Sequence, residues 1–324
     1  MHESQIFSIT SASAFESAAL DTFTFQYENV PVYRQFCTLL NVSANDVNSL
    51  DKIPYLPIQF FKSHTILPKK TTAELTFSSS GTTGSTTSKH HVLKAALYEQ
   101  SFLQGFQRCY GNPSNYVILA LLPSYLERQG SSLVYMANSL IEKSGHSDSG
   151  FYLNNLEALT HTIERLEKIK QPTILIGVSY ALLDLIERNP LKLNHTIVME
   201  TGGMKGRRKE MIKEELHHTL KKGFGVMQIH SEYGMTELLS QAYSKGEGVY
   251  HCPPWMRVST RDTEDPLQAV HGKTGGINVI DLANRYSCSF IATDDLGRVA
   301  SNGSFKILGR FDSSDIRGCN LMVL

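Results

Sequence analysis

Apolar and polar residues alternate along the middle of the chain with the two periods that mark strands and helices. Between residues 115 and 230, short apolar runs of strand length are separated by stretches with apolar residues at helical spacing. The expected strands are 115–122, 173–177, 195–200 and 226–230. The expected helices are 131–144, 155–170, 179–188 and 207–221. Strands and helices in alternation predict a parallel sheet with helices on both faces.

The two ends of the chain have different patterns. Residues 12–45 carry apolar side chains typical of helices, and the run 53–61 interrupts them because proline fixes φ and lacks an N–H donor. After about residue 245, helical periodicity fades and strand-like runs follow. These runs are 276–282, 287–293 and 304–310. We therefore expect three regions: a helical N-terminal segment packed on the core (1–70), an α/β core (71–250) and a β-rich subdomain (251–324).

Charge and composition exclude several classes of protein. The 31 Lys and Arg residues balance 31 Asp and Glu residues, which argues against a general nucleic-acid binder. The longest apolar stretch, 117–122, is far shorter than the roughly 20 residues that span a bilayer, and the N-terminus does not have the pattern of a secretory signal. Five scattered cysteines without a C-x-x-C pair are typical of reduced thiols. We expect a cytoplasmic protein without a membrane span or a nucleic-acid partner.

The most distinctive stretch, residues 78–89, is rich in Ser, Thr and Gly and ends in Lys89. Its glycines allow backbone N–H groups to turn inward and its hydroxyls add donors, an arrangement that suits a phosphate chain. A flexible linker is the alternative interpretation. A Walker P-loop is excluded because Ser88, not glycine, precedes the lysine. The candidate phosphate-binding residues are Ser79, Ser80, Gly81, Thr82, Thr83 and Gly84.

Two further segments follow predicted strands, at the edge of a parallel sheet where ligands bind. The first is the glycine-rich segment 202–204, and an ordinary β–α turn is its alternative interpretation. The second is 233–237, in which a tyrosine can stack on a base, a threonine can contact phosphate and a glutamate can hold Mg²⁺, although helix capping also explains the pattern. The candidates are Gly202, Gly203, Met204, Tyr233, Gly234, Met235, Thr236 and Glu237.

In their order and spacing, these segments resemble the motifs of the adenylate-forming superfamily, which includes acyl- and aryl-CoA ligases, adenylation domains of peptide synthetases and luciferases. The stretch 79–84 with Lys89 resembles its phosphate-binding loop, and 233–237 resembles its Y-G-x-T-E motif. The stretch 309–318 resembles its G-R-x-D…R-G hinge motif and contains Arg310. Thr293-Asp294 is similar to its T/S-G-D motif, although the glycine is missing, and we favour Asp294 over Asp295 as the ribose ligand.

Within this superfamily the chain resembles LuxE-type acyl-protein synthetases, notably in residues 25–36, 53–64 and 122–136. The resemblance implies an α/β fold: the large N-terminal domain of the adenylate-forming fold, with layered parallel-rich sheets, helices and a small β-rich subdomain. Full-length ligases carry a smaller C-terminal domain with a catalytic lysine beyond the hinge motif. Because the sequence ends at Leu324, soon after this motif, we expect no C-terminal lid domain.

The resemblance also implies an enzyme that uses ATP and Mg²⁺ to activate a carboxylic acid, here expected to be a fatty acid, as acyl-AMP. The acyl group would then pass to a thiol, and Cys319 matches the cysteine that carries it in LuxE-type proteins. Asp294 and Arg310 would fix the ribose, and His230 would orient the carboxylate or act as a base. The catalytic candidates are Cys319, Glu237, His230 and Lys89, with Glu237 as the metal ligand.

Two alternatives remain open at this point. The first is an acyl- or aryl-CoA ligase that uses CoA directly. The second belongs to another class, a nucleotide-binding scaffold or partner subunit without adenylation activity. The expected partners are a carboxylic acid together with an acyl-donor protein, an acyl-acceptor protein or CoA.

Overall fold

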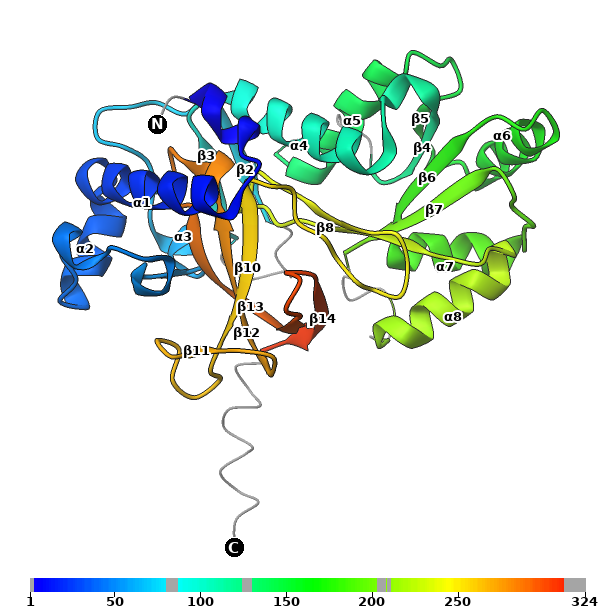
Figure 1. Ribbon diagram of the computed structural model, residues 1–324. Helices are drawn as coiled ribbons and strands as arrows, with labels where there is room; N and C mark the ends of the chain where they lie inside the picture. Colours follow the sequence, from blue (N-terminus) through cyan, green and yellow to red (C-terminus); the bar gives the residue numbers. More distant parts are fainter. Residues whose placement is uncertain (1–2, 80–86, 124–129, 203–207, 209–210, 312–324) are drawn as a thin grey trace, which may run out of the picture.

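A six-stranded sheet forms one half of the molecule, with the strand order β5-β4-β6-β7-β8-β9 (Figure 1). The computed structural model describes residues 3–79, 87–123, 130–202, 208 and 211–311. Strands β5 to β8 run parallel and β9 is antiparallel to β8. The strands are β4 (Val117–Leu121), β5 (Gly150–Phe151), β6 (Thr173–Val178), β7 (Thr196–Thr201), β8 (His230–Tyr233) and β9 (Ala242–Ser244).

Helices cover both faces of this sheet, as the alternating pattern predicted. In Figure 1, α4 and α5 lie on one side and α7 and α8 on the other. The helices are α4 (Ala95–Tyr110), α5 (Ser132–Ser144), α6 (Leu156–Lys168), α7 (Ser179–Arg188) and α8 (Lys213–Phe224). Every residue of β4 and β6 is buried, because parallel strands between two helical layers have no solvent face.

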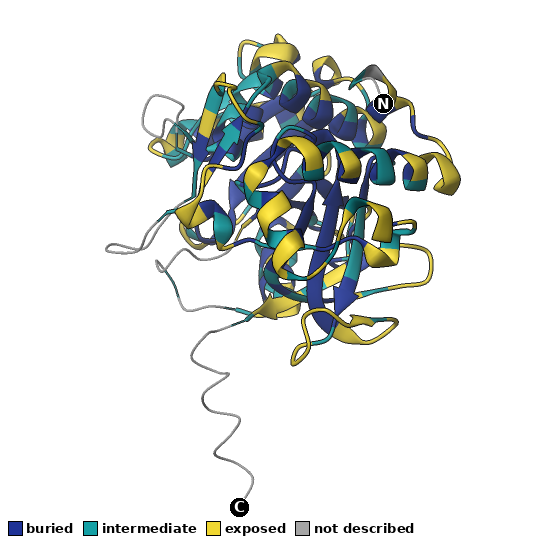
Figure 2. Cartoon of the chain, turned by 90° about the vertical axis from the view of Figure 1, so that its left-hand side faces the viewer, coloured by how far each residue is buried: buried dark blue, intermediate teal, exposed yellow. Residues whose placement is uncertain are grey.

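Helix α6 shows how the sequence pattern becomes structure. Asn155 caps the helix by accepting a hydrogen bond from the Ala158 N–H. Leu159, Ile163 and Leu166 lie at helical spacing, and all three are buried. Figure 2 shows the general result, with buried strands inside and exposed residues on the outer faces of the helices.

The second sheet contains strands from both ends of the chain. Its order is β1-β13-β12-β10-β11, with β14 paired to β13. β1 is parallel to β13, and the other pairs are antiparallel. The strands are β1 (Leu56–Pro57), β10 (Met256–Arg261), β11 (Ala269–Val270), β12 (Thr274–Asp281), β13 (Phe290–Val299) and β14 (Phe305–Arg310). A separate hairpin joins β2 (Leu75–Ser78) to β3 (Lys89–Val92).

The N-terminal helices pack on this second sheet rather than forming a separate body. They are α1 (Ala12–Asn29), α2 (Pro31–Leu39) and α3 (Phe60–Ser63). The rings of Tyr33 and Phe290 stack with centroids 5.9 Å apart. The buried Gln26 amide donates to the Arg285 carbonyl (2.9 Å) and accepts from the Ser289 N–H (3.1 Å). The division into three regions stays a prediction, and β1 ties the first of them to the last.

Two expected elements are displaced along the chain. Helix α8 begins at Lys213 and ends at Phe224, and Gly225, with a left-handed φ of 63°, caps it. The apolar run 226–230 was expected to be a strand, but Met227 is 87% exposed and the strand begins only at His230. In the described ranges, no helix is long and apolar enough to cross a membrane.

Candidate active site

The Ser/Thr/Gly-rich stretch connects β2 to β3, and the hairpin fixes both of its ends. The Ser79 N–H donates to the Ser88 carbonyl (3.0 Å), and the Ser88 N–H donates to Ser79 Oγ (2.9 Å). Lys89 follows as an exposed residue of β3. The predicted phosphate ligands Ser80, Gly81, Thr82, Thr83 and Gly84 lie outside the described residues, so their role stays a prediction.

The segment 233–237 follows β8 and is held from two sides. His90 Nδ1 lies 2.8 Å from the Thr236 carbonyl oxygen, and the Asn284 amide donates to the Glu237 carbonyl (2.8 Å). Asn284 Oδ1 also lies 3.0 Å from His90 Nε2. His90 was not predicted as a site residue from the sequence, although it directly follows Lys89. Its contacts tie the strand after the phosphate stretch to the backbone of Thr236 and Glu237.

The Glu237 side chain is only 5% exposed. Burial raises the pKa of this carboxyl, while a hydrogen bond with Ser88 and the charge of Arg310 act in the opposite direction. The contact with Ser88 places the carboxylate beside the base of the predicted phosphate-binding stretch.

Asp295 joins Tyr233 to Arg310. The Tyr233 hydroxyl donates to Asp295 Oδ2 (2.7 Å), and Arg310 Nε lies 3.3 Å from Asp295 Oδ1. Asp294 faces the other side of β13, because side chains alternate along a strand, and it accepts a hydrogen bond from Gln59. The structure therefore brings Asp295, rather than the predicted Asp294, to Tyr233 and Arg310.

The two carboxyls of Glu237 and Asp295 are suited to a cation. Burial raises the pKa of Asp295 as it does that of Glu237, and the charge of Asp295 raises the pKa of Glu237 further. Arg310 is their common counter-charge, but its side chain is 69% exposed. Among the described residues, no three His, Cys, Asp or Glu side chains form a metal cluster. The pair therefore fits Mg²⁺, which protein sites usually hold through one or two carboxylates together with phosphates and water.

His230 lies at the start of β8, whereas the sequence placed it at the carboxyl end of a strand. Its Nδ1 is 3.1 Å from the Tyr110 hydroxyl. Burial and the nearby charge of Lys245 lower its pKa to about 4, so the imidazole is neutral at pH 7. Its role as an orienting group or base stays a prediction.

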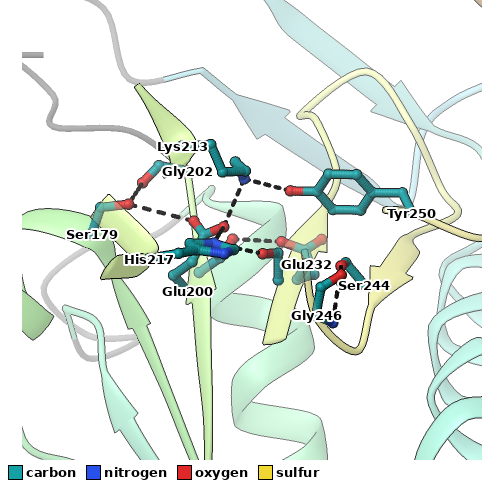
Figure 3. A network of polar contacts seen from close by, with 11 residues as sticks. Ser179, Glu200, Gly202, Lys213, His217, Glu232, Ser244, Gly246 and Tyr250 are labelled. Atoms are coloured by element: carbon teal, nitrogen blue, oxygen red, sulfur yellow. Dashed lines mark hydrogen bonds and ion pairs between the residues drawn. The ribbon is translucent and has the colours of Figure 1, made fainter. Parts of the chain in front are cut away.

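A buried polar network lies at the carboxyl end of β7 (Figure 3). Gly202 adopts a left-handed φ of 57°, and its carbonyl accepts from Ser179 Oγ (3.3 Å). Two residues earlier, Glu200 accepts from Lys213 Nζ (2.6 Å). The network was not predicted from the sequence, although Glu200 is the acidic residue of the apolar run 195–200. Gly203 and Met204 lie outside the described residues.

The four described cysteines are free, as the sequence predicted. Burial raises the pKa of every one of them, so none is an activated thiolate at neutral pH. They are Cys37, Cys109, Cys252 and Cys288. Cys319, the predicted acyl acceptor, lies outside the described residues.

The two sheets and the helices around them are those of the large N-terminal domain of adenylate-forming enzymes, which confirms the predicted fold; the expected lack of a lid domain stays a prediction. More particularly, the chain belongs to the LuxE family of acyl-protein synthetases, whose family model matches residues 9–324. No sequence among the curated proteins matches the chain.

Several solved structures share this fold. ATP-bound MatB from Rhodopseudomonas palustris has a TM-score of 0.53 at 17% identity, covering 72% of this chain and 47% of that one. The ATP-bound RpMatB-BxBclM chimera B1 has a TM-score of 0.56 at the same identity and coverage. An open conformation of 2-hydroxyisobutyryl-CoA ligase, in complex with 2-HIB-AMP and CoA, has a TM-score of 0.65 at 13% identity. The match covers 93% of this chain and 70% of that one. The chain spans about half the length of the MatB structures.

Proposed function

We propose that this protein is an ATP-dependent acid–thiol ligase that makes an acyl-AMP and then passes the acyl group to a thiol. The observation that carries the proposal is the buried carboxylate pair Glu237 and Asp295, which Tyr233, Arg310 and Ser88 surround. Membership of the LuxE family supports the same chemistry.

In the first half-reaction, a carboxylate oxygen of the acid attacks the α-phosphorus of ATP, and pyrophosphate leaves with the electron pair of the broken P–O bond. The stretch between Ser79 and Ser88 would hold the β- and γ-phosphates. Glu237 would hold Mg²⁺, which neutralises charge as pyrophosphate departs. Alignment of the acid with the α-phosphate lowers the activation barrier, because the entropy of bringing the two groups together is already lost on binding. This effect contributes up to roughly 7–11 kcal/mol.

The ribose has two candidate ligands on β13. Asp294 is the residue that the motif resemblance favours. Asp295 is the second candidate, because its carboxylate meets both Tyr233 and Arg310. The Tyr233 ring is packed against Phe305, with centroids 5.4 Å apart, so its orientation toward an adenine would be fixed before nucleotide binds.

In the second half-reaction, a thiolate attacks the acyl carbon and AMP leaves, which forms a thioester. We propose Cys319 as the thiol and a fatty acid as the acid, on the resemblance to LuxE-type proteins. Direct transfer to CoA is the second candidate, because the structurally similar 2-hydroxyisobutyryl-CoA ligase was solved with CoA. Expected partners are therefore the acid, an acyl-donor or acyl-acceptor protein, or CoA.

The Cys319→Ser variant tests the second half-reaction. We expect a radiolabelled fatty acid, with ATP and Mg²⁺, to give a hydroxylamine-labile label on the wild-type protein. The label should disappear in Cys319→Ser while acid-dependent exchange of pyrophosphate into ATP continues. Thioester formation on free CoA that is unaffected by Cys319→Ser would instead support the CoA ligase. Tight ATP binding without turnover of any acid would indicate a nucleotide-binding scaffold.

A further inference from the structure

The network at the end of β7 contains Glu200, the one charged residue of this strand. Glu200 is 2% exposed. Its Oε1 accepts from Lys213 Nζ (2.6 Å) and lies 3.3 Å from His217 Nε2, both on α8. On the other side, Ser179 Oγ lies 3.5 Å from Glu200 Oε2 and 3.3 Å from the Gly202 carbonyl oxygen. The first residue of α7 thus connects Glu200 to the glycine turn (Figure 3).

Glu200 and Lys213 form an ion pair that stability alone does not explain. Burial would raise the pKa of Glu200, but the hydrogen bond with His217 and the charge of Lys213 outweigh it and lower the pKa to about 2. Burial would lower the pKa of Lys213, but the charge of Glu200 raises it. Both groups are therefore charged at neutral pH. Apolar side chains of similar volume often stabilise a protein at least as well as such a pair, so its arrangement suggests a positioning role.

The same lysine connects β7 to the second sheet. Lys213 Nζ donates to the Tyr250 hydroxyl (2.6 Å). The backbone of Tyr250 pairs with Phe305 of β14 through two hydrogen bonds of 2.8 and 3.1 Å, and their rings stack with centroids 5.3 Å apart. The Tyr250 ring also lies 5.8 Å from the ring of Tyr233, whose hydroxyl holds Asp295. A continuous series of contacts therefore leads from the Gly202 carbonyl through the Glu200–Lys213 ion pair and Tyr250 to Tyr233.

We propose that Glu200, Lys213 and Tyr250 are positioning residues that hold the Gly202 turn and the Tyr233–Asp295 pair in register for nucleotide binding. This inference rests on the proposed function for the identity of the ligand, ATP. It adds that ATP affinity depends on an ion pair that need not touch the nucleotide.

Tyr250→Phe is the sharpest test, because it removes the hydroxyl and keeps the ring packed on Phe305. We expect it to weaken ATP binding, measured by calorimetry, by roughly ten-fold, the effect of losing one hydrogen bond to a charged group. Lys213→Met should weaken binding further, and Lys213→Arg should recover part of the loss. In pyrophosphate exchange, KM for ATP should rise while kcat changes little, which a purely structural defect would not produce.

Lys221→Met is the matched control, because Lys221 lies on the same helix and pairs with the exposed Glu247 (2.9 Å). It should leave ATP affinity unchanged. Unchanged ATP affinity in folded Tyr250→Phe, or an equal loss in Lys221→Met, would overturn the inference. If Lys213→Met does not fold, the ATP affinity of Tyr250→Phe still tests the inference. If the wild-type protein bound ATP but showed no acid-dependent exchange, the proposed function would be wrong. The comparison of ATP affinities between the variants would still test the positioning role.

Discussion

Glu237 is a buried carboxyl whose charge is destabilised by its surroundings in the absence of a cation. Burial raises its pKa, and the nearby Asp295 adds repulsion. A buried carboxylate of this kind lowers the stability of the fold at neutral pH. Its presence is explained if it neutralises the charge of a cation that binds together with the nucleotide. The proposed role of Glu237 as a metal ligand can therefore be tested through the charge of this one side chain.

The Glu237→Gln variant keeps the size of the side chain and removes its charge. We expect exchange of pyrophosphate into ATP to fall by roughly 10²- to 10³-fold, the size of effect seen when one stabilising group for transition-state charge is removed. The melting temperature should stay equal or rise, because a neutral amide is cheaper to bury than a carboxylate. Exchange rates across Mg²⁺ concentrations and thermal unfolding measure both effects. Wild-type exchange with unchanged Mg²⁺ dependence would rule out Glu237 as the metal ligand.

The two neighbouring aspartates of β13 give a paired prediction. Asp295→Asn should raise KM for ATP by roughly ten-fold or more, because it weakens the contacts to both Tyr233 and Arg310. Asp294→Asn, which affects the contact with Gln59, should change KM little. Steady-state exchange kinetics of the two variants measure the difference. The opposite ranking would favour Asp294, the residue chosen from the sequence.

The sequence motifs proposed Tyr233, Glu237 and Arg310 and favoured Asp294 over Asp295 as the ribose ligand, whereas the structure brings Asp295 to Tyr233 and Arg310. The choice depends on which face of β13 each residue occupies. The face that each residue occupies depends on the pairing of β13 with β12 and β14, and both pairings shift register near these aspartates. A bulge of this kind comes from tertiary pairing and leaves no local pattern in the sequence.

At the scale of elements, the end of β7 depends on an ionised Glu200. Because its pKa in the folded state is about 2, below the usual value near 4.5, the unfolded chain binds more protons between these pH values. The stabilisation is complete above about pH 4.5 and is lost as the pH falls toward 2.

Glu200→Gln should therefore flatten the acid branch of the stability profile. Between pH 4.5 and 3, the unfolding free energy of the wild type should fall more steeply than that of the variant, by up to about 1.4 kcal/mol per pH unit. Urea unfolding at several pH values measures the two slopes. Parallel curves would show that Glu200 does not titrate with a lowered pKa.

The buried strands β4, β6 and β7 and the helices between them could be predicted because burial on both sides imposes a simple pattern, whereas the two-residue strand β5 was not expected. Strand β6 and helix α7 begin and end close to where they were expected. The region around α8 and β8 could not be placed as well. The apolar run 226–230 looks like a strand, but pairing with β7 begins only at His230. Which part of an apolar run pairs is decided by its neighbour in the sheet.

In the molecule as a whole, segments that are far apart in the sequence contact each other. Gln26 of α1 is fully buried and bonds to the backbone of Asn284, Arg285 and Ser289. These partners are about 260 residues away, so no local pattern could have revealed them. The sequence predicted helices near the N-terminus but not the sheet that they would cover.

Gln26→Ala should lower the unfolding free energy by roughly 2–4 kcal/mol, because it leaves buried carbonyls and an N–H without partners. Gln35→Ala, at an exposed position of α2, is the control and should change stability by less than about 0.5 kcal/mol. Denaturant unfolding of the two variants measures the difference. Equal stabilities would show that the contacts of Gln26 do not hold the two ends together.

Acid-dependent exchange of labelled pyrophosphate into ATP is the most direct measurement of acyl-AMP formation by this protein. We expect exchange that requires Mg²⁺ and a carboxylic acid and is strongest with fatty acids in a panel that also includes aromatic and short-chain acids. In Glu237→Gln it should fall by roughly 10²- to 10³-fold. The proposed function would be contradicted if the folded, ATP-binding protein gave no exchange with any acid in the panel.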